Sequence, residues 1–251
     1  MARTRAACAA VAIMLAAGTA GCSSGPQTPS ITVFAAASLQ PAFTEIAEQY
    51  KTEYPGMAVD FNFAGSSDLA TQLTQGAGAD VFASANTAQM DKVAQAGLLD
   101  GAAVPFATNT LVIVTAPGNP HRVRSFADLA GPGLAVVVCQ DPVPCGAATH
   151  KVEERTGVSV NPVSEEPDVT DVLNKVTTGQ ADAGVVYRTD AIHAGDKVAT
   201  VEFPEAAGAV NTYPIGLLKD APQAGPARAF VDVVTGEAGQ KILHAAGFGK
   251  P

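Results

Sequence analysis

Aromatic residues are scarce in this chain of 251 residues, which has no tryptophan, 4 tyrosines and 10 phenylalanines. A broad aromatic platform for stacking sugars or nucleobases is therefore not expected. Positive charge is also scarce, because 15 Lys and Arg residues stand against 24 Asp and Glu residues and the net charge is −9. Contact with a nucleic-acid backbone needs a basic surface, so we expect no nucleic-acid partner. After the first residues, no apolar run is long enough to span a bilayer.

The remaining composition is that of a folded protein. Hydrophobic residues make up 47% of the chain and charged residues 16%, which is too apolar for a disordered protein. A chain of this length holds one or two domains and buries roughly three quarters of its unfolded surface.

The first residues have the layout of an export signal. Arg3 and Arg5 precede a short apolar run over 6–17, and small residues then lead to Cys22. This junction resembles the lipobox of bacterial lipoproteins. It implies a signal peptide over 1–21, lipid on Cys22, a tether over 22–30 and an extracytoplasmic location. The alternative is a plain secretory signal that leaves Cys22 as an unmodified thiol.

Four cysteines are present, and two of them fall in the exported domain. Cys8 lies in the apolar run, whereas Cys139 and Cys145 flank a turn-forming segment rich in proline. In an oxidising compartment, this pair predicts a disulfide. Two alternatives remain open: a zinc site that adds His150, and an enzyme with Cys145 as nucleophile.

Strand-like and helix-like segments alternate along the chain. Apolar runs of strand length occupy 31–36, 59–63, 79–83, 111–116, 134–138, 183–187 and 213–218, and most are followed by residues at helical spacing. This alternation predicts an α/β fold with mostly parallel sheets covered by helices on both faces. The acidic pairs 153–154 and 165–166 are expected on solvated faces.

The pattern divides into two similar halves around Leu111. The C-terminal helices have no sheet of their own, so we expect them to return to the first half. The expected lobes are 31–110 with 214–251, and 111–213, joined by a hinge of two crossings near 108–111 and 211–214.

Two loops of the first half have the same design. Each ends a strand with small residues and opens a helix with a serine, Ser38 in one loop and Ser66 in the other. Helix N-termini carry unpaired N–H donors and partial positive charge, so two that face one point form an anion site without a cation. The alternative is that both serines only cap their helices.

Several motifs resemble the periplasmic molybdate-binding proteins of ABC importers, in order over nearly the whole exported chain. The resemblance implies a two-lobed type II periplasmic-binding fold with a tetrahedral dianion in the cleft. Its motifs are Ile31-Thr-Val-Phe-Ala-Ala-Ala-Ser38-Leu39, Phe63-Ala-Gly-Ser66-Ser67, Ala79-Asp80-Val-Phe-Ala-Ser84-Ala85, Asp141-Pro-Val-Pro-Cys145-Gly146, Gly184-Val-Val-Tyr187, Phe203-Pro204, Tyr213-Pro214 and Gly247-Phe248.

The resemblance also implies the ligands of the anion. Ser38 and Ser66 supply hydroxyls and backbone N–H groups, Cys145 and Val169 supply backbone N–H groups, and Tyr187 supplies its phenol. No carboxylate is among them, which suits molybdate or tungstate because neither carries a proton at neutral pH. The alternatives are a receptor for sulfate or phosphate and a Cys145-dependent enzyme.

The expected partner is the membrane permease of an importer. We expect a lipid-anchored monomer with no cofactor, no metal held directly by protein side chains and no enzymatic activity. Asp68 and Asp168 lie next to proposed ligands, and we expect them to point outward at helix N-termini. If one of them instead accepted a hydrogen bond inside the site, the preferred anion would shift toward protonated phosphate.

Overall fold

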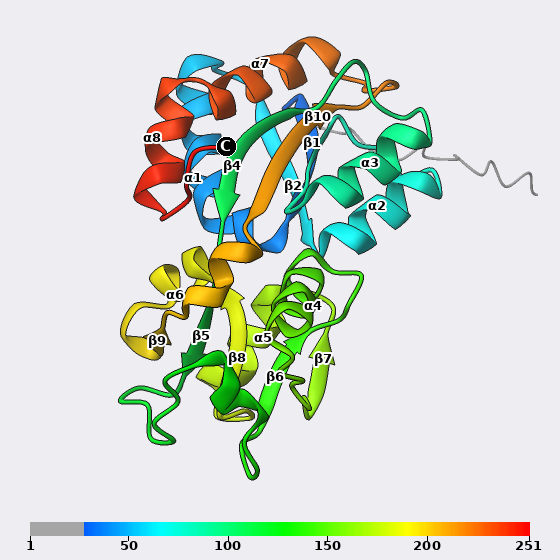
Figure 1. Ribbon diagram of the computed structural model, residues 1–251. Helices are drawn as coiled ribbons and strands as arrows, with labels where there is room; N and C mark the ends of the chain where they lie inside the picture. Colours follow the sequence, from blue (N-terminus) through cyan, green and yellow to red (C-terminus); the bar gives the residue numbers. More distant parts are fainter. Residues whose placement is uncertain (1–27) are drawn as a thin grey trace, which may run out of the picture.

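The computed structural model describes residues 28–251, which form two five-stranded sheets with helices on both faces (Figure 1). The expected α/β fold class with two sheets is confirmed. The expected signal peptide, the lipidation site Cys22 and most of the expected tether lie outside the described residues. Ser30, the last residue of that tether, is the first residue of a strand.

The first sheet combines strands from both ends of the chain. Its order is β2 (Ala58–Ala64), β1 (Ser30–Ala36), β3 (Val81–Ala83), β10 (Asn211–Leu217) and β4 (Val104–Asn109). Strand β1 runs parallel to β2 and β3, whereas β10 runs antiparallel to β3 and β4. The late strand β10 therefore pairs with strands of the first half of the chain.

The second sheet repeats this arrangement. Its order is β7 (Ser164–Glu166), β6 (Val136–Cys139), β8 (Ala183–Tyr187), β5 (Leu111–Thr115) and β9 (Ala199–Val201). Strand β6 is parallel to β7 and β8, and β5 is antiparallel to β8 and β9. Both sheets are thus mixed, with β1, β2 and β3 equivalent in position to β6, β7 and β8.

Alternate residues of β1 face two different cores, because successive side chains of a strand point to opposite faces. Val33 packs with Phe43 and Phe230, and Phe34 packs with Leu69 and Met90. The first core lies under α1 (Gln40–Glu53), α7 (Ala224–Thr235) and α8 (Glu237–Ala245), and the second under α2 (Ser66–Thr74) and α3 (Thr87–Gln95). The C-terminal helices therefore cover the first sheet.

The second sheet has its own core of mostly valine and alanine side chains. The helices around it are α4 (Pro144–Thr156), α5 (Val169–Thr177) and α6 (Arg188–Ala194). Short 3-10 helices occupy Ala37–Leu39, Phe126–Ala130, Gly195–Lys197 and Pro204–Gly208. The expectation of a solvated Glu166 is wrong, because β7 buries this residue and its carboxylate accepts hydrogen bonds from Lys175 and Ser164.

The chain passes between the two sheets at two places. Strand β4 ends at Asn109 and β5 begins at Leu111, while the return passage enters β10 at Asn211. Asn109 and Asn211 are paired across these two passages. Within residues 28–251, no helix combines the length and the apolar character needed to cross a membrane.

Candidate functional site

The carboxyl ends of five strands meet between the two sheets. Ser38 follows β1, Ser66 follows β2, Cys145 follows β6, Val169 follows β7, and Tyr187 is the last residue of β8. All five line one small cavity, together with Ala36, Ala37, Ala64, Gly65, Ala85, Val143, Pro144 and Asp168. The structure therefore brings together every residue proposed as a ligand from the sequence.

Three helices begin at the lining of this cavity. Ser66 and Val169 are the first residues of α2 and α5, and Cys145 is the second residue of α4. The first N–H groups of a helix have no partner within the helix, and the helix dipole makes this end positive. The arrangement favours an anion without a cationic side chain.

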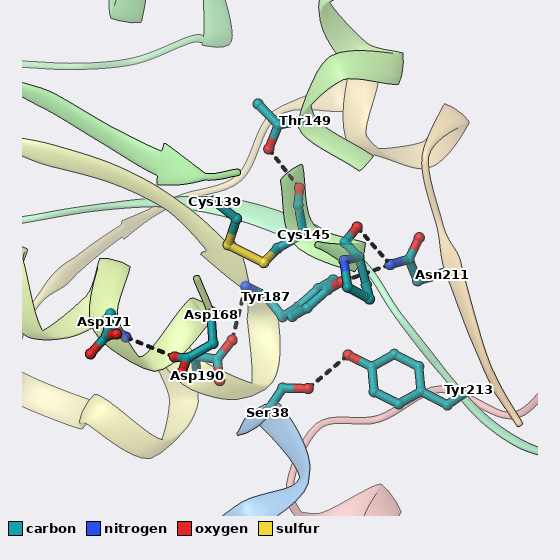
Figure 2. Close-up of a disulfide and its surroundings, with 11 residues drawn as sticks. Ser38, Cys139, Cys145, Thr149, Asp168, Asp171, Tyr187, Asp190, Asn211 and Tyr213 are labelled. Atoms are coloured by element: carbon teal, nitrogen blue, oxygen red, sulfur yellow. Dashed lines mark hydrogen bonds between the residues drawn. A yellow bond between two sulfur atoms is a disulfide. The ribbon is translucent and has the colours of Figure 1, made fainter. Parts of the chain in front are cut away.

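The hydroxyl groups of the cavity receive hydrogen bonds from behind. The backbone N–H of Ala85 donates to Ser66 Oγ at 3.0 Å. Asn211 Nδ2 donates to Tyr187 Oη at 2.6 Å, as Figure 2 shows. A hydroxyl that accepts from one side keeps its own proton to donate on the other. Ser38 Oγ lies 3.0 Å from Tyr213 Oη, and either of these two groups can be the donor.

Tyr187 is held as a neutral phenol. Its side chain is 1% exposed, and its burial, together with the neighbouring Tyr213 and Asp190, raises its pKa well above the usual value. A phenol that does not ionise remains a donor throughout the physiological pH range.

Three carboxylates lie near the cavity at the starts of helices. Asp68 is exposed in the first turn of α2. The expectation of an outward-pointing Asp168 is wrong, because this residue is half-buried and lines the cavity. Its Oδ1 accepts from the N–H of Asp171 at 3.0 Å and so caps α5, and burial raises the pKa of its carboxyl. Asp190 is buried and accepts from the N–H of Tyr187 at 3.0 Å, and burial raises its pKa to about 7.

Cys139 and Cys145 form the predicted disulfide, with an S–S distance of 2.04 Å (Figure 2). It links the end of β6 to the first turn of α4. The zinc site and the nucleophilic Cys145 are therefore wrong, because both sulfur atoms are used in the bond. His150 is exposed beside Glu153, and residues 28–251 contain no group of three or more side chains that could hold a metal ion.

The two sides of the cavity touch at its rim. Gln89 Nε2 from the first sheet's helices donates to the carbonyl of Pro142 at 2.8 Å. A Cβ atom placed on Gly65 would lie 2.2 Å from the carbonyl oxygen of Pro167. Only glycine permits this approach.

The sequence reasoning missed three buried polar residues behind the cavity, Asn109, Asn211 and Tyr213. They are 4%, 4% and 0% exposed, respectively, and are hydrogen-bonded to one another or to the proposed ligands. Asparagine is disfavoured in strands, so an asparagine at each passage between the sheets could have indicated a functional role.

The chain matches the family described as bacterial extracellular solute-binding protein over residues 31–249. It is 61% identical to the molybdate-binding protein ModA of Mycobacterium tuberculosis, over 96% of each chain. It is 31% identical to the putative ABC transporter substrate-binding lipoprotein YvgL of Bacillus subtilis, over 91% of this chain and 92% of that protein.

The fold has a solved counterpart in the periplasmic molybdate-binding protein of Azotobacter vinelandii. The TM-score is 0.77 at 23% identity, and the match covers 88% of this chain and 99% of the other. These relatives are binding proteins of transporters, so the chain is a binding protein and not an enzyme. The resemblance found in the sequence is confirmed, and the chain belongs to the family of bacterial extracellular solute-binding proteins.

Proposed function

We propose that this protein binds molybdate and tungstate outside the cytoplasm and delivers them to the permease of an ABC importer. The observation that carries the proposal is the cavity in which Ser38, Ser66, Cys145, Val169 and Tyr187 converge from both sheets. The 61% identity to a molybdate-binding protein supports the same ligand.

The donors of the cavity match the chemistry of these anions. Molybdate and tungstate are fully deprotonated at neutral pH, so they accept hydrogen bonds and cannot donate them. Phosphate keeps a proton in this range and needs an acceptor. Sulfate has the same charge and shape but is smaller, so discrimination against it depends on how closely the two sides of the cavity meet.

Binding is coupled to closure of two lobes about a hinge. The proposed lobes are 31–110 with 214–251, and 111–213, and the two passages at Asn109 and Asn211 form the hinge. The first lobe offers the hydroxyls of Ser38 and Ser66. Closure adds the donors of the second lobe and forms the contacts of Gly65 with Pro167 and of Gln89 with Pro142.

Membrane attachment follows from the N-terminal segment. We propose that the signal peptide over 1–21 is removed and that Cys22 carries lipid, which holds a monomer near its permease. The similarity to a protein described as a substrate-binding lipoprotein supports this arrangement.

The test is the melting temperature of residues 23–251 with molybdate, tungstate, sulfate and phosphate added in turn. A ligand at a thousand times its dissociation constant adds about 4 kcal/mol of stability. For a chain of this size, this raises the melting temperature by about 8–16 °C. A rise with molybdate and tungstate alone supports the proposal. A rise only with sulfate or phosphate changes the ligand, and no rise with any of the four refutes the anion site.

A further inference from the structure

Two asparagines stand side by side where the chain passes between the sheets. Asn109 ends β4, Asn211 begins β10, and the two are partners in the strand pairing. Neither is among the residues that line the cavity, although each is 4% exposed and donates a hydrogen bond to a tyrosine phenol.

The amide of Asn211 has only one possible orientation. Its Nδ2 lies 3.1 Å from the carbonyl oxygen of Pro144, an atom that only accepts hydrogen bonds. The nitrogen, and not the amide oxygen, must therefore face this carbonyl. The same nitrogen lies 2.6 Å from Tyr187 Oη, so the second amide proton is donated to the phenol oxygen (Figure 2).

This bond fixes the direction of the phenol proton of Tyr187. A phenol has one proton, and it cannot point along the bond in which its oxygen accepts. Tyr187 lines the cavity, so its proton is free to be donated to an anion there. The phenol is buried and held neutral, so the proton remains present.

Asn109 is oriented in a similar way on the other side. Its Oδ1 accepts from the N–H of Thr110 at 3.0 Å, which leaves Nδ2 to face Thr189 Oγ1 at 2.8 Å and Tyr213 Oη at 3.4 Å. A phenol that accepts from Asn109 gives its proton to Ser38 Oγ, 3.0 Å away. The proton of Ser38 is then available to the cavity.

We infer that Asn109 and Asn211 are positioning residues that set the direction of the hydroxyl protons of Ser38 and Tyr187, so that these hydroxyls act only as donors to the bound oxyanion. The inference rests on the proposed oxyanion function. It adds a specificity mechanism for a ligand that must donate a hydrogen bond, such as protonated phosphate. The hydroxyl oxygens of Ser38 and Tyr187 already accept from protein donors and do not accept from such a ligand.

The test is a double-mutant cycle read as molybdate affinity by titration calorimetry on the full-length protein. The variants are Asn211→Leu, Tyr187→Phe and the double variant. Tyr187→Phe removes the donor and weakens binding by about 10- to 150-fold. Asn211→Leu alone weakens binding by about 3- to 10-fold, because the phenol proton loses its fixed direction. In the Tyr187→Phe background, Asn211→Leu has no further effect, within about twofold.

Two controls separate positioning from general damage. Asn62→Leu removes an asparagine that donates only to Gln72 from β2, and it leaves molybdate affinity unchanged. Asn211→Ser replaces Asn211→Leu if the latter does not fold. A parallel cycle with Asn109→Leu and Ser38→Ala tests Asn109, and Asn109→Leu is expected to leave affinity unchanged in the Ser38→Ala background.

The outcomes distinguish this inference from the function on which it rests. If the unaltered protein does not bind molybdate, the proposed function fails. If it binds, but the losses from Asn211→Leu and Tyr187→Phe multiply in the double variant, then Asn211 acts independently of the phenol proton and the inference is overturned. The same holds if Asn211→Leu leaves affinity unchanged.

Discussion

Replacement of Ser66 by alanine should lower both the molybdate affinity and the stability of the protein. Ser66 is 1% exposed at the first position of α2, and its Oγ accepts from the N–H of Ala85 at 3.0 Å. The hydroxyl therefore accepts from a buried backbone group behind the cavity, and in the proposed function it also donates its proton to the anion in front. Ser66→Ala removes both contacts.

The two losses have different sizes and different readouts. A hydrogen bond to a charged group contributes about 1.5–3 kcal/mol, so molybdate affinity should fall about 10- to 150-fold. The N–H of Ala85, which is 3% exposed, loses its acceptor. An unsatisfied buried donor costs about 1–3 kcal/mol, which lowers the melting temperature without ligand by about 2–12 °C.

Ser84→Ala is the matched control. Ser84 is fully buried at the end of β3, and its hydroxyl donates to the carbonyl of Asn86 at 2.8 Å, but it does not line the cavity. It should lower the melting temperature and leave molybdate affinity unchanged, as measured by titration calorimetry. If Ser66→Ala binds molybdate as tightly as the unaltered protein, or if Ser84→Ala loses the same affinity, the assignment of the cavity is refuted.

Three further changes test closure, the disulfide and a buried carboxyl. Gly65→Ala places a Cβ 2.2 Å from the carbonyl of Pro167, so it should block closure and weaken molybdate binding more than tenfold in calorimetry. Replacing Cys139 and Cys145 by alanine opens a loop with a sequence separation of 6 and should cost about 2 kcal/mol in urea denaturation. Burial raises the pKa of Asp190 to about 7, so the folded protein holds a proton that the unfolded chain has lost; the free energy of unfolding should therefore fall as pH rises from about 4 to about 7.

Controls and contradicting outcomes differ among the three changes. Gly78→Ala, with nothing within 4 Å of the added carbon, is the control for Gly65→Ala, and equal affinities for the two would argue against closure. An unchanged urea midpoint after loss of the disulfide would mean that the turn is held by other contacts. Asp190→Asn keeps an acceptor for the N–H of Tyr187 and should flatten the decline; an unchanged decline would assign it to another group.

Sequence periodicity predicted the strands that are apolar runs and missed β4, β7 and β9. Strands such as β1 and β8 are continuous apolar runs, and they were found. Strand β4 begins with two exposed residues, while β7 and β9 are only three residues long, so none of them has a distinctive pattern. Glu166 was misjudged because it lies in the short strand β7, where it is buried and accepts from Lys175 of α5.

Part of the site was predictable from local sequence patterns. A strand that ends in small residues before a helix marks Ser38 and Ser66, and the family resemblance supplied Cys145, Val169 and Tyr187. The groups behind them were not predictable, since Asn211 reaches Tyr187 across 24 positions and Asn109 reaches Tyr213 across 104. Such contacts depend on how two sheets are joined, which periodicity does not encode.

The net charge of −9 repels a dianion, so a site without a cation must attract the anion by short-range contacts. At physiological salt, repulsion from surface carboxylates is screened beyond about 8 Å, whereas contact with N–H and O–H donors acts within the cavity. None of the cavity's lining residues within 28–251 is a lysine or an arginine. A buried ammonium would attract any small anion and would leave an uncompensated charge when the site is empty. Neutral donors avoid this cost, but they distinguish one anion from another only if their protons have a fixed direction. The selectivity of the proposed site therefore depends on the groups that donate to the hydroxyl oxygens of Tyr187 and Ser66.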